Sequence, residues 1–287
     1  MSLYYSTKHW LKKGRWKLRR GVTTVRWGAD RLSTTPAVFG NSMPKSGSHL
    51  IIQILLGLTR FGPFVNPGYP PVNRAEDNRN LSPEAVLDNI KNMRPGDIRY
   101  GYIHAKEPFV TALTGPDRAT IFVYRDPRDM IVSHVFYATE IHKGHGMYPY
   151  YTQVLNSVEE RINAQIMGVV EPGFELSPIR KKYDEYLCWL EQPQVLSIRF
   201  EDLINQRGDT LNAMLDEVQK TGYTIPTPRE KALEILAEAI QPKKSHTFRS
   251  GKTGGWREYF TKEHKELFKD VAGDLLVRLG YEESNNW

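Results

Sequence analysis

The sequence predicts an α/β fold in which a central parallel β-sheet is flanked by helices on both faces. Short apolar segments alternate along the chain with segments that have the apolar periodicity and capping residues of helices. Strands separated by helices pair in parallel, and helices then cover both faces of the sheet. The chain of 287 residues has the apolar, charged and aromatic content of a soluble globular protein.

The N-terminal segment, residues 1–34, is expected to be a basic extension, and residues 35–287 a single domain. The extension contains nine Lys or Arg and a single acid, Asp30, so it carries +8 within a net charge of +6. The domain itself is therefore nearly neutral, which argues against nucleic-acid binding. Apolar residues at helical spacing predict a helix that either packs on the domain, the preferred interpretation, or lies on an anionic membrane surface. Gly14 and Gly21 weaken a continuous helix.

The first predicted strand, turn and helix cover residues 37–57. Residues 37–39 form a short apolar strand, the turn has the sequence Met-Pro-Lys-Ser-Gly-Ser, and a helix with an apolar face follows. The N–H groups at the start of a helix and the positive end of its dipole attract anions, and Lys45 adds a positive charge. Pro44, rather than glycine, precedes this lysine, so the turn is not the P-loop of nucleoside triphosphatases. The segment predicts a site for a phosphate-like group.

A loop, two strands and two short helices are predicted next. Residues 61–80 are rich in Pro, Gly and Asn, which indicates a loop. Ser82 followed by Pro83 has the pattern of a helix start, and β-branched and aromatic residues favour strands. The expected elements are a helix at 82–93, a strand at 98–104, a helix at 108–113 and a strand at 119–125.

The second half of the chain is predicted to be mostly helical. Asp126 and Pro127 have the pattern of an N-cap followed by proline in the first turn, and residues 227–230 have the pattern of a capping box. Residues 142–152 are rich in Gly and Tyr and indicate a second loop. The remaining expected elements are helices at 127–141, 155–167, 178–191, 209–221, 228–240 and 261–279 and a strand at 195–200.

Three polar residues end or directly follow the predicted strands: Lys45, His104 and Arg125. Because ligands of parallel sheets bind at the carboxyl ends of the strands, the fold should bring these residues to one edge. Residues 249–256 add a further basic, glycine-rich segment. Two anion sites on one edge fit a ligand with two separated phosphates better than a triphosphate. No acid is obviously placed to hold Mg²⁺ beside the turn, which weakens a kinase or NTPase interpretation.

Three segments together resemble the motifs of sulfotransferases that use 3′-phosphoadenosine 5′-phosphosulfate (PAPS). PKSGSHL resembles the family's 5′-phosphosulfate loop PKSGTTW, YRDPRDMIVSHVFY its 3′-phosphate motif, and RSGKTGGWREYFT its late R-K-G-x-x-G-D-W motif. They occur in the family's order and span residues 37–261. The resemblance implies the P-loop NTPase-like sulfotransferase architecture, PAPS as donor, adenosine 3′,5′-bisphosphate (PAP) as product, and chemistry that needs no metal.

The resemblance also assigns roles to individual residues. Lys45 is implied to contact the 5′-phosphosulfate bridge and stabilise the leaving phosphate, and His104 to be the base that takes the acceptor's proton. Phe200 stands where the family has a tyrosine that can reach the adenine. The other implied cofactor contacts are Ser46, Gly47, Ser48 and His49 at the 5′ end, and Arg125, Ser133, Arg249, Ser250 and Gly251 at the 3′-phosphate.

Other positions depart from the family pattern. Leu50 replaces the loop tryptophan that packs near the adenine, Tyr102 replaces a lysine two residues before the catalytic histidine, and Ser250 replaces a lysine. The family's dimerisation motif K-x-x-x-T-V-x-x-x-E is only partly matched, because Lys262 replaces its valine. A monomer and a homodimer are both compatible with this pattern.

The expected reaction is in-line sulfuryl transfer to a hydroxyl of an acceptor, with a small-molecule metabolite as the preferred class. A glycan or a lipid head group is an alternative acceptor. Two other classes of protein are alternatives: a P-loop kinase of a small metabolite, and a peripheral membrane or scaffold module. The two predicted loops should shape the acceptor pocket, and His134, His142 and His145 suit acceptor contact.

The cysteine content and the search for targeting signals predict the cellular compartment of the protein. The chain has one cysteine, Cys188, and shows neither a secretory signal nor an apolar run long enough to cross a bilayer. These features predict a cytoplasmic protein, with peripheral membrane contact through the basic extension as an option.

Overall fold

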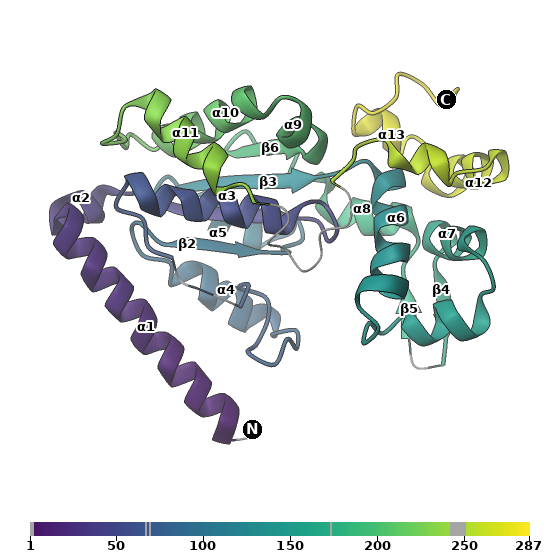
Figure 1. Ribbon diagram of the computed structural model, residues 1–287, viewed down its shortest axis with the longest axis horizontal. Coiled ribbons are helices and arrows are strands. Elements are labelled where there is room, and N and C mark those ends of the chain that lie inside the picture. The colour runs from purple at the N-terminus through teal and green to yellow at the C-terminus, as the bar shows by residue number, and fades with distance from the viewer. Residues whose placement is uncertain (1–2, 67, 69, 173, 242–250) are drawn as a thin grey trace.

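The central sheet is parallel, as predicted (Figure 1). The computed structural model describes residues 3–66, 68, 70–172, 174–241 and 251–287, with side chains from residue 14 onward. Within these residues the sheet has four strands in the order β2-β1-β3-β6, so the first strand lies in the interior. They are β1 (Ala37–Ser42), β2 (Ile98–Gly101), β3 (Arg118–Tyr124) and β6 (Val195–Arg199). Their carboxyl ends therefore meet at one edge.

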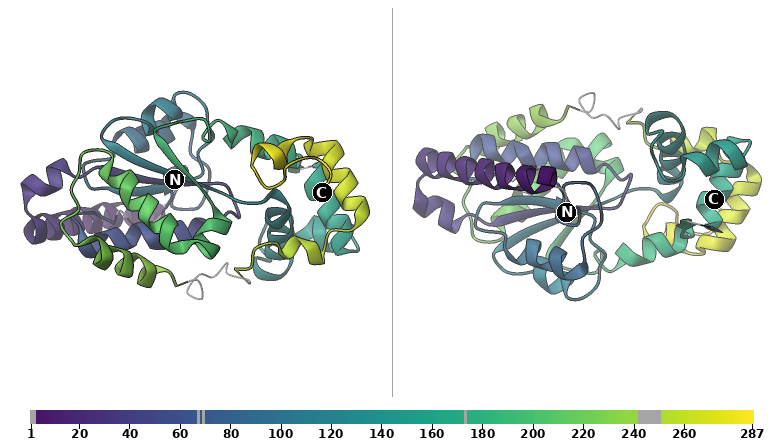
Figure 2. Two further views of the ribbon diagram at one scale, coloured as in Figure 1. Left: turned by 90° about the horizontal axis from the view of Figure 1, so that it is seen from above. Right: turned by 90° about the horizontal axis from the view of Figure 1, so that it is seen from below.

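Helices cover both faces of this sheet. Successive strand residues point to opposite faces, so Val38 belongs to one apolar core and its neighbour Phe39 to the other. The Val38 side is covered by α3 (Ser48–Phe61), α10 (Arg207–Gln219) and α11 (Arg229–Ala239), and the Phe39 side by α4 (Pro83–Lys91), α5 (Phe109–Leu113) and α8 (Ile179–Leu187) (Figure 2). Because both faces are covered, every residue of β1 and every residue of β3 after Arg118 is buried.

A further group of helices lies beyond the carboxyl ends of the strands (Figure 1). It consists of α6 (Pro127–Phe136), the π-helical turn η1 (Tyr137–Ile141), α7 (Val158–Met167), α12 (Lys262–Ala272) and α13 (Leu275–Arg278), with a hairpin of β4 (Val169–Glu171) and β5 (Phe174–Leu176). Buried Arg128 of α6 pairs with Asp126 at 2.7 Å and with Glu282 at 2.5 Å. The C-terminal segment is thus tied to the start of α6, next to the sheet edge.

The N-terminal extension forms a long helix, α1 (Leu3–Trp27), followed by the short helix α2 (Ala29–Thr34). Gly14 and Gly21 do not interrupt α1. No helix in the described part of the chain is long and apolar enough to cross a bilayer.

The carboxyl-terminal half of α1 packs beside β2, as the packed-helix interpretation expects. The Trp16 indole donates to Asp97 Oδ1 at 3.2 Å, and Arg20 Nη1 donates to Pro95 O at 3.0 Å. The guanidinium of Arg94 lies 4.6 Å from the centroid of the Trp16 ring. The amino-terminal end of α1 projects away from the sheet (Figure 1).

The predicted capping box at the start of α11 is wrong. Thr227 Oγ1 instead donates to Phe61 O at the end of α3, at 3.0 Å, and Pro228 precedes α11 without a side-chain cap. A capping box does form at the start of α12, where the side chains of Thr261 and His264 bind each other's backbone N–H groups.

Several short elements were not predicted. Helix α9 (Phe200–Asn205) begins where the last predicted strand was expected to end, and the hairpin β4–β5 and the π-helical turn η2 (Tyr150–Val154) were not expected. The helix expected at 261–279 is broken at Gly273, which has a φ of 57°. Segments of one turn or three residues have too little periodicity to be recognised in a sequence.

Candidate active site

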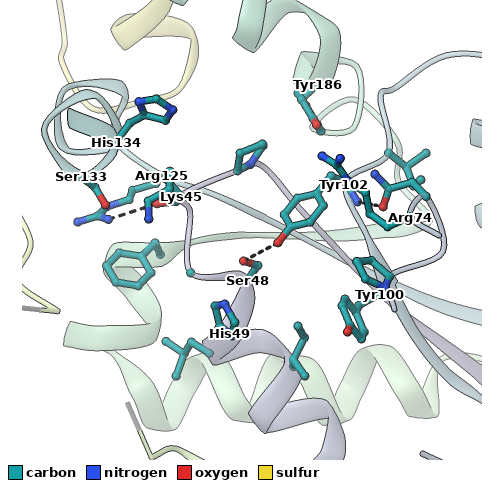
Figure 3. Close-up of a pocket in the computed structure, with 18 of the residues that line it drawn as sticks. Lys45, Ser48, His49, Arg74, Tyr100, Tyr102, Arg125, Ser133, His134 and Tyr186 are labelled. Atoms are coloured by element: carbon teal, nitrogen blue, oxygen red, sulfur yellow. Dashed lines mark hydrogen bonds between the residues drawn. The ribbon is translucent and has the colours of Figure 1, made fainter. Parts of the chain in front are cut away.

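A cavity of about 1270 Å³ lies at the carboxyl edge of the sheet. It is lined by residues from the turn after β1, the segment after β2, α6, α9 and the late loop (Figure 3). The predicted site residues that line it are Lys45, Gly47, Ser48, His49, His104, Arg125, Ser133, Phe200 and Gly251. Ser46 is instead buried within the turn, and Arg249 and Ser250 lie outside the described residues.

The turn after β1 has the backbone geometry of an anion-binding loop. Lys45 and Gly47 both have positive φ, at 65° and 89°, and alternation of such residues aims successive N–H groups to one side. A Cβ atom on Gly47 would lie 2.5 Å from Phe200 Cδ2, so only glycine fits. Because the first N–H groups of a helix have no helical partners, the turn and the start of α3 offer donors to the cavity.

The Lys45 side chain lies against an aromatic wall. Its Nζ is 3.6 Å from the centroid of the Tyr137 ring in η1, a distance at which the ring face attracts a cation. Burial raises the pKa of Tyr137, so this phenol is neutral at neutral pH. The π-helical turn thus places an uncharged ring beside the predicted catalytic lysine.

Arg125 joins the two predicted anion sites. Its Nη1 donates to Lys45 O at 3.3 Å and its Nη2 to Lys252 O at 3.2 Å. The guanidinium lies 4.5 Å from the centroid of the Phe200 ring. Its Nε is buried and has no protein partner among the described residues. The turn after β1, the end of β3 and the late loop therefore meet, as the sequence predicts.

Asp129 holds the late loop against α6. Its two carboxylate oxygens accept from Gly254 N at 2.7 Å and from Trp256 N at 2.9 Å, at the start of the short 3-10 helix η4 (Gly255–Glu258). Asp129 was not among the site residues predicted from the sequence. Its partners lie more than 120 residues away along the chain, and no local pattern reveals such a pairing.

His104 lies three residues beyond β2 and pairs with Glu185 of α8. Its Nε2 is 3.2 Å from Glu185 Oε2, and its ring is 5.0 Å from that of Tyr186. Burial lowers the pKa of His104, and the Glu185 carboxylate partly offsets that shift. In the neutral ring, Nε2–H donates to Glu185, which leaves the lone pair on Nδ1.

Buried hydrogen bonds fix the segment that carries His104. Asn41 at the end of β1 donates through Nδ2 to Ile103 O at 2.9 Å and accepts from Ile103 N at 2.8 Å. The Trp189 indole also donates to Ile103 O, at 2.8 Å. Ala105 N donates to Glu185 O at 2.7 Å. His104 and its carboxylate partner are therefore positioned through backbone hydrogen bonds, and neither Asn41 nor Glu185 was singled out from the sequence.

His134 presents a defined hydrogen-bond donor. Lys182 Nζ donates to Gln165 Oε1 at 2.8 Å, and since an ammonium can only donate, the Gln165 amide must donate to His134 Nδ1, also at 2.8 Å. The proton of His134 is therefore on Nε2. Burial and the nearby charges of Lys182, His145 and Lys45 hold its pKa well below the usual value, so the ring stays neutral. It lies on the same side of the cavity as Ser133, Lys45 and Arg125 (Figure 3).

Within the described residues, no group of three or more His, Cys, Asp or Glu side chains is placed to hold a metal ion. The cavity is lined by cationic side chains and N–H donors and by the imidazole of His104. Such a set can bind two anionic groups and remove a proton from a hydroxyl between them.

One family model matches most of this chain. Residues 36–280 match the family model described as "Sulfotransferase domain". None of the curated proteins matches the chain.

Solved structures with the same fold include mouse sulfotransferase SULT7A1 complexed with PAP, at 14% identity and a TM-score of 0.57 over 88% of this chain and 91% of that one. Retinol dehydratase in complex with androsterone and inactive cofactor PAP matches at 16% identity and a TM-score of 0.53, over 86% and 83% of the two chains. Retinol dehydratase in a complex with retinol and PAP matches at 16% identity and a TM-score of 0.51, over 86% of this chain and 84% of that one. At these identities the likeness is one of fold.

Proposed function

The chain belongs to the sulfotransferase family, and on this premise we propose that it transfers the sulfuryl group of PAPS to an acceptor hydroxyl and releases PAP. The observation that carries the proposal is the meeting of Lys45, Arg125 and His104 on one cavity. The structural neighbours were solved with PAP, which supports this nucleotide as the product.

The described residues fit a nucleotide with an anionic group at each end. Among the described residues, Arg125 Nε at the cavity and Ser46 Oγ in the turn are buried without a hydrogen-bond partner. An unsatisfied buried donor is costly, and a bound phosphate oxygen would satisfy it. We assign the 5′-phosphosulfate to the turn after β1 and the start of α3. The 3′-phosphate is assigned to Arg125, Ser133 and Gly251, with Arg249 and Ser250 expected beside them.

PAPS supplies the sulfuryl group that is transferred. His104 Nδ1 takes the proton of the acceptor hydroxyl while the acceptor oxygen bonds to sulfur. Lys45 donates to the bridging oxygen that departs with the electron pair of the broken S–O bond. To do so, its ammonium turns from the Tyr137 ring toward the start of α3. Glu185 orients His104 by accepting from Nε2.

The acceptor is proposed to be a small molecule, since the structural neighbours include complexes with retinol and androsterone. The wall formed by residues 71–81, 102–109 and 142–145 would hold it. These segments include parts of the two loops that the sequence analysis assigned to the acceptor.

A transfer assay with ³⁵S-labelled PAPS tests the reaction. We expect transfer to continue in excess EDTA and to stop on addition of PAP, which competes for the same site. A kinase would instead need Mg²⁺ and ATP, so label transfer from [γ-³²P]ATP that EDTA abolishes would replace the proposal with that class.

A further inference from the structure

We propose that the acceptor carries an anionic group next to its reacting hydroxyl, and that Arg74 binds this group. The inference rests on the proposed sulfotransferase function and deepens it by naming the chemical class of the acceptor. The group is a carboxylate, sulfate or phosphate on a small molecule.

Among the described residues, the Asp, Glu, Lys and Arg side chains that line the cavity are all cationic. The cationic side chains that line it are Lys45, Arg74, Lys106, Arg125 and Arg207. Among the described residues that line it there is no Asp or Glu. Glu185 pairs with His104 from α8, but it does not itself line the cavity.

The donor nucleotide accounts for only some of these cations. Lys45 and Arg125 belong to the two anion sites already described, and Arg207 begins α10, just after α9, which carries the Phe200 that packs on Arg125. Arg74 and Lys106 remain at the other end of the cavity, where the acceptor must lie. Figure 3 shows Arg74 on the side of Tyr100 and Tyr102, away from Arg125 and Ser133.

Arg74 and the proposed base line the same cavity. Its positive charge acts on the Tyr186 hydroxyl, lowering a pKa that burial raises, and the Tyr186 ring is 5.0 Å from that of His104. Lys106 follows His104 by two residues, and its charge helps to lower the pKa of that histidine. An anionic group bound between these cations would place a neighbouring hydroxyl near His104.

Arg74 is held on an ordered turn. Arg74 and Asn80 form an antiparallel bridge, and Arg74 Nη1 donates to Asn78 O at 3.2 Å. Asn73 Oδ1 accepts from Tyr102 N at 3.3 Å, which ties this turn to the segment before His104. A guanidinium held in this way is pre-organised for two parallel hydrogen bonds to a carboxylate, sulfate or phosphate.

The neighbouring side chains are polar as well. Asn73, Asn78 and Asn80 line the cavity near Arg74, and amides can bind both hydroxyl and carboxylate oxygens. The cavity wall thus combines a cationic subsite with neutral donors and acceptors and with apolar side chains such as Leu81 and Phe109, a lining suited to an acidic molecule that also has apolar surface.

The test compares matched acceptors that differ in one charge. Glucuronic acid is paired with its methyl ester, and glucose 6-sulfate and glucose 6-phosphate are each paired with glucose. Transfer is followed with labelled PAPS. We expect the anionic member of at least one pair to have a kcat/KM about 10–100-fold higher than its neutral partner, the range for one charge-assisted hydrogen-bond pair.

Arg74→Gln is expected to abolish this preference, so that the ratio of kcat/KM between acid and neutral partner falls about 10–100-fold. Calorimetric titration with PAP checks that the variant still folds and binds the nucleotide. Arg79→Gln is the matched control, because Arg79 lies on the same turn but pairs with Asp77 and does not line the cavity. It should keep the wild-type ratio.

Two results would overturn the inference alone: a wild-type enzyme that binds PAP but transfers to none of the anionic acceptors or prefers the neutral partners, or an Arg74→Gln variant with the wild-type ratio. A wild-type protein that neither binds PAP nor transfers label to any acceptor would instead overturn the proposed function.

Discussion

The two ends of the cavity are built in different ways. The proposed donor end consists of the turn after β1, Arg125 directly after β3, the first turn of α3 and Ser133 of α6, so backbone geometry at the sheet edge largely sets it. The acceptor end consists of side chains from separate loops and α8, held by contacts such as the bond from Ala105 N to Glu185 O. The donor end is therefore a property of the fold, whereas the acceptor end depends on which loops the fold carries.

Removal of the proposed base, His104, should distinguish the two ends most strongly. His104→Ala is expected to lower kcat by roughly 10²–10⁴-fold, the usual contribution of a general base. Affinity for PAP should not change, because His104 lies at the acceptor end. Single-turnover transfer and calorimetry with PAP measure the two quantities. Normal turnover of this variant would show that another group is the base.

Removal of Arg125 at the donor end should mainly weaken binding of the nucleotide. Arg125→Ala is expected to weaken PAP binding by about 1.5–3 kcal/mol, the range for a hydrogen bond to a charged group. Arg60→Ala is the control, since Arg60 is an exposed residue at the end of α3 that pairs with Glu238. Equal PAP affinities in the two variants would contradict the assigned 3′-phosphate site.

Gly47→Ala tests whether backbone geometry sets the donor end. The new Cβ would meet Phe200 at 2.5 Å and would hold a φ of 89°, so we expect a loss of about 1–3 kcal/mol in PAP affinity or stability. Gly208→Ala is the matched control, because a Cβ there meets nothing within 4 Å. Thermal unfolding with and without PAP measures both effects. A Gly47→Ala protein that behaves like the control would mean that the turn can relax.

Glu185→Gln should have the smallest effect on activity, and we expect to see it in the pH dependence of kcat. The Glu185 carboxylate raises the pKa of His104, while burial lowers it below 6.5. The base must be neutral, so activity falls as the pH drops through its pKa. Loss of the carboxylate lowers that pKa further and moves the acid limb of kcat to lower pH, by less than about one unit for a half-exposed pair. Movement of this limb to higher pH would contradict the pairing.

Much of the donor end could be predicted from the sequence. Lys45 and Gly47 lie in a local turn between a strand and a helix, and Arg125 directly follows β3, the clearest strand in the sequence. In a parallel sheet, each of these features fixes a position at the same edge. The structure brings these residues together as expected, although their roles in binding PAPS stay predictions. The predicted helix start at residue 126 is also confirmed, with the Asp126 carboxylate accepting from Arg128 N.

The sequence did not reveal the residues that position others from a distance. Asp129 binds the late loop, Asn41 fixes the segment before His104, and Glu185 orients that histidine. Each acts across at least 60 residues of chain, so hydrophobic periodicity and capping patterns carry no trace of the pairing. The same holds for Arg74, which in sequence is one basic residue in a Pro-rich loop.

The sequence by itself determined the α/β class, the parallel order of strands and helices, and the family, because these depend on local periodicity and on short motifs at strand ends. Tertiary structure alone decided the tautomer of His134, the partner of His104 and the charge of the acceptor end. These features depend on side chains from distant segments, which meet only in the folded chain. Burial of both faces of the sheet keeps water away from them, and hydrogen bonds and charges interact more strongly there than in water.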